Sequence, residues 1–188
     1  IQLALARLKG KLPCIVGTGA NATSHALSLT QQAMELGADG ALLVTPYYNK
    51  PPQSGLYEHF KLIAHSVAIP QILYNVPSRT GCDLLPETVN RLSGISNIVA
   101  LKEATGDIKR LHAIMATGCD INLLSGDDAT AVEFMLAGGK GSVTVAANIV
   151  PKEYKMLCDA ALKGEKDKAL RLHESLQGLF RALFVESN

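Results

Sequence analysis

One lysine stands where a buried strand would deliver it to a ligand. Lys102 directly follows the apolar residues 98–101, so its side chain leaves a run that is predicted to be buried on both faces. Desolvation disfavours the ammonium form, and a neutral amine can attack a ketone to form an imine. The alternative is a lysine whose stem merely extends to water, which is the more common case when position is the only information.

Two further side chains, in and just after the preceding apolar run of residues 70–75, could assist such chemistry. Tyr74 lies near its end, and a phenol there could relay protons while a carbinolamine forms and loses water. Core packing with a hydrogen-bonded hydroxyl is the alternative for this tyrosine. Arg79 lies in segment 77–81, a loop stiffened by proline and glycine. A guanidinium fork matches a carboxylate, although an isolated loop arginine is usually a solvated charge.

Tyr47, Tyr48 and Gly126 complete the candidate ligand-binding positions. The two tyrosines follow the run 40–45 and supply a second hydroxyl, and Gly126 offers bare backbone after the run 121–125. The carboxyl ends of parallel strands are where α/β proteins bind ligands. All the candidate residues follow such runs, so we consider them together.

A dinucleotide site is the sharpest alternative. Gly17, Gly19 and Ala22 match G-x-G-x-x-A after a predicted strand. That fold needs an acid at the tip of the next strand to hold the ribose hydroxyls, and the tip here is Thr45. The glycines are therefore predicted to allow a tight turn, with Asn21 as the cap of the following helix.

Histidine-based and metal-based sites find less support. The five histidines fall within predicted helices and are expected on exposed faces; they are His25, His59, His65, His112 and His173. Asp127 and Asp128 are adjacent at a predicted helix start, where capping is their simplest role. No further ligands accompany them, so no metal is expected.

The elements that must position these residues alternate along the chain. Apolar runs rich in β-branched residues predict parallel strands at residues 13–16, 40–45, 70–75, 97–102, 121–125 and 141–145. Amphipathic segments between them predict helices, such as 22–36, 55–65 and 129–137. The first is expected to begin at Asn21 or Thr23 and to end at Gly37. Six βα units build either an open doubly wound sheet or most of a (β/α)₈ barrel.

Residues 152–184 predict two helices joined around Gly164, with no strand pattern after them. The chain is accordingly divided into residues 1–150, with the six βα units, and residues 151–188, with the last barrel helix and the start of a helical region. The N-terminus has neither an initiator methionine nor a signal-peptide pattern. Both ends are expected to be cuts in a longer sequence.

Composition limits the class of partner. The 188 residues carry 18 basic and 17 acidic side chains spread along the chain, so no basic stripe indicates nucleic acid. No apolar run reaches the ~20 residues of a membrane span. The four cysteines form no CxxC pair and predict reduced, mostly buried thiols in a cytoplasmic protein. The expected ligand is a small molecule.

Taken together, the strand ends resemble the pyruvate-dependent class I aldolase family of TIM barrels, and within it the dihydrodipicolinate synthases. Five motifs occur in the family's order and spacing and span nearly the whole chain. They are Gly17-Thr18-Gly19-Ala20-Asn21, Val44-Thr45-Pro46-Tyr47-Tyr48-Asn49, Tyr74-Asn75-Val76-Pro77-Ser78-Arg79-Thr80-Gly81, Lys102-Glu103-Ala104-Thr105-Gly106 and Leu124-Ser125-Gly126-Asp127-Asp128.

The resemblance implies roles for particular residues. Lys102 would form the Schiff base, with Tyr74 donating and accepting protons. Tyr48 would reach across a tight dimer into the neighbouring subunit's site. The substrate-binding residues would be Arg79 for the carboxylate of the incoming aldehyde, Gly126 through its carbonyl near pyruvate, and Val143 packing near the lysine.

The implied reaction condenses pyruvate with L-aspartate 4-semialdehyde, the entry to lysine and diaminopimelate synthesis. It needs no cofactor beyond the covalent Schiff base, and such enzymes are commonly homotetramers. Sister activities, N-acetylneuraminate lyase and keto-sugar-acid aldolase, share the lysine and the tyrosine, and a non-catalytic barrel fragment is a further alternative. The family's first two barrel strands, with a relay threonine, and its C-terminal helices are not in the sequence.

Some relatives are inhibited by lysine at a site on the dimer interface. The resemblance places its residues in this chain at Gly19, Asn21, His25 and Tyr47. Strongly inhibited relatives often have an acid where His25 stands, so this residue argues against strong inhibition.

Overall fold

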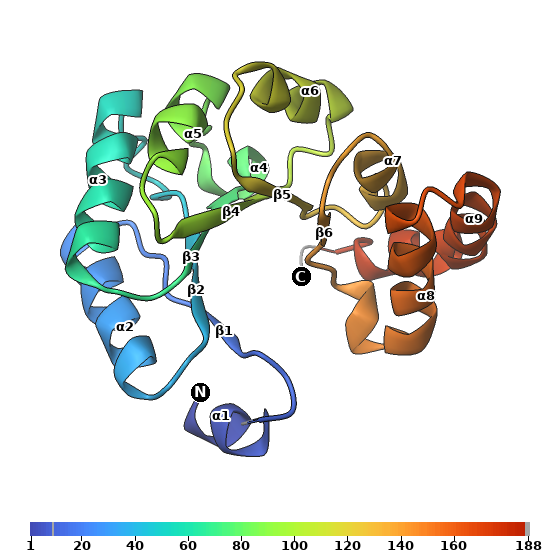
Figure 1. Ribbon diagram of the computed structural model, residues 1–188, viewed down its shortest axis with the longest axis horizontal. Coiled ribbons are helices and arrows are strands. Elements are labelled where there is room, and N and C mark those ends of the chain that lie inside the picture. Colours follow the sequence, from blue (N-terminus) through green and yellow to red (C-terminus); the bar gives the residue numbers. More distant parts are fainter. Residues whose placement is uncertain (9, 187–188) are drawn as a thin grey trace. The chain divides into compact units, whose positions relative to one another are not determined.

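The computed structural model describes residues 1–8 and 10–186, as alternating strands and helices (Figure 1). Within these residues six strands are hydrogen-bonded in chain order, β1-β2-β3-β4-β5-β6. They are β1 (Ile15–Gly17), β2 (Gly40–Val44), β3 (Gln71–Asn75), β4 (Ile98–Glu103), β5 (Asn122–Ser125) and β6 (Gly141–Ser142). The pairs β1–β2, β2–β3 and β5–β6 are parallel. Every strand begins within two residues of its predicted start, which confirms the pattern of buried runs.

Helices precede, separate and follow the strands. They are α1 (Gln2–Leu8), α2 (Thr23–Glu35), α3 (Gln53–Ser66), α4 (Pro77–Thr80), α5 (Pro86–Ser93), α6 (Ile108–Ala116), α7 (Ala131–Leu136), the 3₁₀ helix η1 (Ala146–Asn148), α8 (Pro151–Leu162) and α9 (Lys166–Leu183). The predicted pair of tail helices is confirmed, with Gly164 between them at φ 72°. Gly37 likewise ends α2 at φ 85°, as predicted.

The chain divides into two compact units whose segments interleave. Unit 1 is Ile1–Leu101 with Ala113–Ile121, and unit 2 is Lys102–His112 with Asn122–Asn188. The boundary therefore passes through β4 and α6. The division at residue 150 that the sequence predicts stays a prediction, and residues 187 and 188 lie outside the described part of the chain.

Unit 1 is built around β2 and β3, most of whose successive side chains are buried. Leu43 and Leu73 have no exposed area, and neither has Phe60 on α3. Burying one such side chain is worth about 1.5–3 kcal/mol relative to leaving it in water. A smaller cluster, centred on Ala41 and extended by partly buried side chains of α2, closes the amino end of β2. Continuous burial explains why these runs are apolar rather than alternating.

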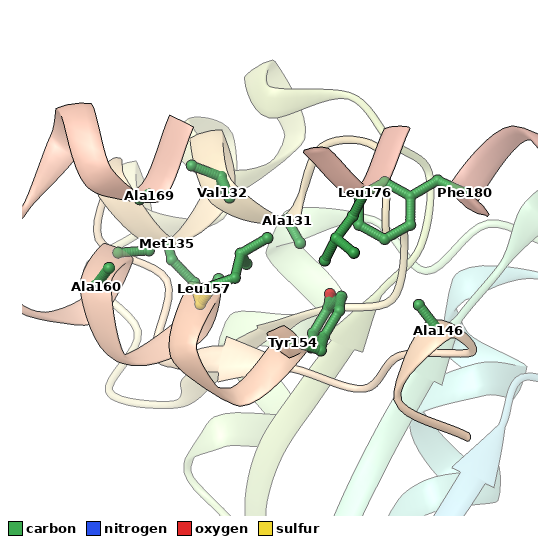
Figure 2. Close-up of a cluster of buried hydrophobic side chains, with 11 residues drawn as sticks. Ala131, Val132, Met135, Ala146, Tyr154, Leu157, Ala160, Ala169, Leu176 and Phe180 are labelled. Atoms are coloured by element: carbon green, nitrogen blue, oxygen red, sulfur yellow. The ribbon is translucent and has the colours of Figure 1, made fainter. Parts of the chain in front are cut away.

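Unit 2 has its own apolar cluster, formed by α7, η1, α8 and α9 (Figure 2). Tyr154, Leu157 and Phe180 lie at most 4% exposed in it. The rings of Tyr154 and Phe180 meet edge to face with centroids 6.2 Å apart, an arrangement that aromatic quadrupoles favour. The cluster fixes the tail helices against the helix that follows β5.

The predicted cap of α2 is wrong. Neither Asn21 nor Thr23 caps the helix, because the N-cap position belongs to Ala22, which makes no side-chain bond. The Thr23 hydroxyl is instead 2.9 Å from Nδ1 of His59 on α3. A contact with the neighbouring helix thus takes the side chain that local sequence assigns to the cap.

His59 also departs from the exposed position that was predicted for it. It is 5% exposed, its ring meets Phe60 edge to face, and Nε2 has no hydrogen-bond partner among the described residues. Burial lowers the pKa of His59 from 6.5 to about 4. The sequence periodicity correctly placed His59 in a helix. That its side of α3 is buried follows only from the packing of α2 against α3, which the sequence pattern does not show.

We expect this histidine to make stability depend on pH. Its folded-state pKa is depressed, so the unfolded chain binds more protons below pH 6.5, and stability falls as the pH drops from 6.5 towards 4. Between pH 7 and pH 5 the loss is about 2 kcal/mol. Urea unfolding of the protein and of His59→Gln at both pH values measures it, and the variant should lose most of this dependence. His65→Gln, an exposed histidine of the same helix, should keep it; equal dependence in all three proteins would contradict the assignment.

The cysteines are less buried than predicted. Cys82 is buried, whereas Cys14, Cys119 and Cys158 are partly exposed, and all four are free thiols. Burial is nevertheless the main cause that raises the pKa of Cys158 to about 11. A thiol with a raised pKa is a poor nucleophile at neutral pH, so Cys158 has no part in the candidate chemistry.

Candidate active site

In unit 1, buried threonines mark the carboxyl ends of the strands. Thr18 and Thr45 follow β1 and β2 directly and are 1% and 0% exposed. The Thr45 backbone N–H donates to the Tyr74 carbonyl at 3.0 Å, and its hydroxyl lies 3.4 Å from that of Thr80. These hydroxyls were not among the predicted site residues, although their place immediately after an apolar run was a usable signal.

Tyr74 and Arg79 are brought together at the end of β3. Tyr74 is partly buried, and burial raises the pKa of its phenol while the nearby positive charge of Arg79 opposes that rise. Arg79 is exposed on α4. The predicted stiff loop 77–81 is in fact one helical turn, which Pro77 begins and Gly81 ends at φ 66°. The turn returns the guanidinium towards the strand from which the phenol projects.

The side chain of Asn75 fixes the chain that follows this turn. Its amide donates to Oδ1 of Asp83 at 3.0 Å, and its carbonyl oxygen accepts from the Leu84 N–H at 2.9 Å. Asn75 has no exposed area, so these bonds are shielded from competing water. The position of Arg79 therefore rests on buried polar contacts at both ends of its segment.

Tyr48 has an unusual backbone and an unusual environment. It is 88% exposed, and its φ of 75° lies in the left-handed region, which costs a non-glycine residue roughly 1–2 kcal/mol. Its N–H donates to the Thr80 carbonyl at 3.2 Å, which ties it to the turn that carries Arg79. Tyr47 beside it is 42% exposed. A large exposed ring held at strained dihedrals is a feature typical of binding surfaces.

The four residues of the predicted regulatory site lie on the segments after β1 and β2. Gly19 and Asn21 follow β1, His25 is exposed on α2, and Tyr47 follows β2. The two segments are joined by Asn49, whose amide donates to the Asn21 carbonyl at 2.9 Å. A Cβ at Gly19 would overlap the Val44 backbone, so this glycine is needed for the close approach of the chains.

In unit 2, Lys102 and Gly126 are in direct contact. Lys102 is partly buried on β4. The residue after it, Glu103, accepts a hydrogen bond through its carbonyl from the Gly126 N–H at 2.7 Å. A Cβ at Gly126 would lie 2.9 Å from Cε and 3.1 Å from Cγ of Lys102. Val143 joins them, because its N–H donates to the Ser125 carbonyl at 2.8 Å. The structure thus groups three of the predicted site residues.

Asp127 and Asp128 were predicted to cap the helix that follows them, and their hydrogen bonds differ from that prediction. The carboxylate of Asp127 accepts from the N–H and the hydroxyl of Thr130, at 3.0 and 2.7 Å, just ahead of α7. Asp128 makes no such bond; its carboxylate accepts from the N–H groups of Val145 and Ala146. The helix begins at Ala131, two residues later than predicted. The predicted capping is therefore wrong for both: the N-cap is Thr130, without a side-chain cap bond, Asp127 bonds that residue in the turn ahead of the helix, and Asp128 bonds a distant segment.

Other features of the described residues lie away from these positions. A cavity of about 700 Å³ is lined in part by Lys11, Cys14 and Asp39, at the amino ends of β1 and β2. The described side chains include no cluster of three or more His, Cys, Asp or Glu that could hold a metal ion. Among the helices of residues 1–8 and 10–186, none has the length and apolarity to cross a membrane.

Comparison with known sequences decides the family. The sequence model of the dihydrodipicolinate synthetase family matches residues 1–188, the whole chain. The chain belongs to that family. Among curated family members, 4-hydroxy-tetrahydrodipicolinate synthase of Coxiella burnetii (strain Dugway 5J108-111) is 58% identical over 188 residues, and that of Pseudomonas aeruginosa is 54% identical over 189. The matches cover all of this chain but 64% and 65% of those proteins.

Solved family structures agree with the fold. The dihydrodipicolinate synthase of Acinetobacter baumannii, determined in complex with pyruvate, has a TM-score of 0.97 and 48% sequence identity to this chain. The match covers 100% of this chain and 65% of that one. The predicted fold class, a (β/α)₈ barrel represented here by six of its strands, is confirmed, and the open doubly wound sheet is excluded.

Proposed function

We propose that the protein is a Schiff-base-forming, pyruvate-dependent lyase that condenses pyruvate with L-aspartate 4-semialdehyde. The observation that carries the proposal is Lys102, an amine at the end of a buried strand, with its stem packed against the bare backbone of Gly126. Membership of the dihydrodipicolinate synthetase family supports the same chemistry. The reaction would open lysine and diaminopimelate synthesis in the cytoplasm, and it needs no cofactor beyond the imine itself.

The proposed first step is imine formation. The neutral amine of Lys102 attacks the ketone carbon of pyruvate to form a carbinolamine, which loses water to leave a carbon–nitrogen double bond. Tyr74 donates and accepts the protons of these steps. Burial raises the pKa of its phenol, so the phenol keeps its proton at neutral pH and is available as an acid.

The remaining residues bind and orient the substrates in this proposal. Arg79 pairs with the carboxylate of the aldehyde, for which its planar fork of donors is well suited. The Gly126 carbonyl faces bound pyruvate, and Val143 packs beside the lysine. Arg79 is exposed in the described chain, so a diffusing substrate can reach it.

Trapping the imine tests the proposed activity. The protein is incubated with pyruvate, reduced with borohydride, digested and examined by mass spectrometry. We expect a reduced pyruvyl adduct on the peptide that contains Lys102 and on no other lysine. A folded protein without an adduct would exclude the imine class and favour a non-catalytic barrel.

The aldehyde is tested separately. Consumption of aspartate semialdehyde in the presence of pyruvate is compared with cleavage of N-acetylneuraminate at matched concentrations. We expect the first to be faster, because the segments 77–81 and 102–106 resemble the synthases at the two places where sialic acid lyases differ. The reverse order would leave the imine chemistry standing and reassign the substrate.

We further propose a homo-oligomer, a tetramer of tight dimers, in which Tyr48 projects into the site of the neighbouring subunit. Its 88% exposure and positive φ are features that a partner subunit would account for. Tyr48→Ala is expected to raise the dimer dissociation constant about 30-fold, the effect of losing a tyrosine hot spot. Sedimentation velocity measures it, with the exposed Leu62 on α3 changed to alanine as control. Equal dissociation of both variants would contradict the placement of Tyr48.

Regulation by lysine is a separate proposal. Its residues would be Gly19, Asn21, His25 and Tyr47, on two segments that the Asn49–Asn21 hydrogen bond joins. An initial rate that does not change in millimolar lysine would remove it.

A further inference from the structure

Asp128 is a buried carboxylate that serves a segment far along the chain. It follows β5 and is 3% exposed. Its Oδ2 accepts from the N–H of Val145 at 3.2 Å and from that of Ala146 at 3.0 Å, while Oδ1 has no hydrogen-bond partner among the described residues. Burying a carboxylate costs free energy unless its hydrogen bonds compensate. An uncharged acceptor could hold the same segment without that cost, so the charge calls for a further explanation.

The segment that it holds leaves the sheet early and turns into η1, where the Val145 and Ala146 carbonyls accept from N–H groups of residues 148–150. β6 comprises only Gly141 and Ser142, after which the Val143 N–H donates to the Ser125 carbonyl. The Ala146 side chain, with no exposed area, packs into the apolar cluster of unit 2 (Figure 2). Two backbone donors on one charged oxygen are the strongest polar contact that the structure gives residues 143–146.

This segment borders the same backbone as the lysine. The Ser125 carbonyl bonds the Val143 N–H, and the next residue, Gly126, is the one whose added Cβ would touch Lys102. Any shift of residues 143–146 therefore changes the wall beside the lysine stem. Asp128 lies two residues beyond Gly126 and bonds the Val145 and Ala146 N–H groups, so it connects the segment that contains Gly126 with residues 145–146.

We propose that Asp128 is a positioning residue of the active site: its carboxylate clamps the Val145 and Ala146 amides and thereby holds residues 143–146 against the Ser125–Gly126 backbone that borders Lys102, which shapes the pyruvate pocket. The proposal rests on the proposed function, because the pocket belongs to the pyruvate imine. Asp128 acts through the segment and not on the substrate itself. Its removal should weaken the capture of pyruvate more than it slows the chemistry that follows.

Kinetic trapping separates these two effects. Initial rates of borohydride-trapped adduct are measured against pyruvate concentration for the protein, Asp128→Asn and Asp128→Ala. In Asp128→Ala we expect the half-saturating concentration to rise about tenfold, which corresponds to about 1.4 kcal/mol of lost pyruvate binding, with the maximal rate lowered no more than about threefold. Asp128→Asn keeps one acceptor oxygen, so its half-saturating concentration should lie between those of the unchanged protein and Asp128→Ala. If the alanine variant does not fold, the asparagine variant provides the test. Leu176→Ala removes apolar packing from the same cluster and should leave the half-saturating concentration unchanged.

Amide hydrogen exchange supplies a readout that needs no activity. Protection of the Val145 and Ala146 amides is expected to fall at least about tenfold in Asp128→Ala, with little change in α9. Unchanged half-saturation in the folded variants would overturn the proposal, and so would unchanged protection of these amides. A wild-type protein that forms no adduct would overturn the proposed function and the pocket role with it, while lost protection would still establish the clamp.

Discussion

Lys102→Arg is expected to abolish the pyruvate adduct while the protein stays folded. Arginine keeps the positive charge and nearly the length of the side chain, but its guanidinium is not deprotonated in proteins and cannot attack a ketone. Loss of a covalent nucleophile lowers turnover by about 10⁴-fold or more. Lys102→Ala should give the same loss, because the amine and not the charge is required. Borohydride trapping and steady-state rates measure both variants.

The matched control is Lys140→Arg, at an exposed lysine just before β6. It makes the same chemical change in unit 2 and should alter neither the adduct nor the rate. An adduct that persists in Lys102→Arg would assign the imine to another amine, and full turnover without an adduct would exclude imine chemistry altogether.

Gly126→Ala is expected to slow imine formation about 100-fold, the scale of effect produced by a 1 Å misplacement. The added Cβ would lie 2.7 Å from Cβ of Ala104 and 2.9 Å from Cε of Lys102. The lysine stem is flexible and can move aside, but the Ala104 Cβ is fixed to the backbone after β4, so the two segments must also separate. Overpacking of this kind costs about 1–3 kcal/mol of stability. Single-turnover trapping gives the rate, and urea unfolding gives the stability.

Gly178→Ala isolates the effect of position. Gly178 lies within α9, and a Cβ there would meet nothing within 4 Å. Alanine should therefore stabilise the helix by about 1 kcal/mol and leave the rate unchanged. If Gly126→Ala retained the wild-type rate, the close packing of Gly126 against Lys102 would have no role in holding the amine.

The strands were predictable because their burial is continuous. Runs such as 40–45 and 70–75 are apolar at successive positions, and the two strands found there have nearly the predicted bounds. β6 is the exception, with two residues where five were predicted. The apolar pattern does continue to Val145, but Val145 is already helical at φ −81° and ψ −39° ahead of η1, and Asp128 accepts from the Val145 and Ala146 N–H groups. A bond spanning 17 residues has no local trace in the sequence.

The candidate site was partly predictable for the same reason. Residues that directly follow apolar runs, such as Lys102 and Gly126, are in contact because adjacent strands end together. The burial of His59 and the clamp by Asp128 depend on which helix or segment packs against them. Neither charge nor periodicity at those positions carries that information, so both required the structure.

The interleaving of the two units has a consequence for synthesis on the ribosome. Unit 1 needs residues 113–121 as well as residues 1–101, yet residues 102–112, which belong to unit 2, leave the exit tunnel between them. Domains usually fold as contiguous pieces while the chain emerges, N-terminal piece first. Here the nascent chain cannot finish its first unit before part of the second has been released. A nascent chain stalled once residue 121 has left the exit tunnel should therefore be far more protease-resistant than one stalled when only residues up to 101 have left it.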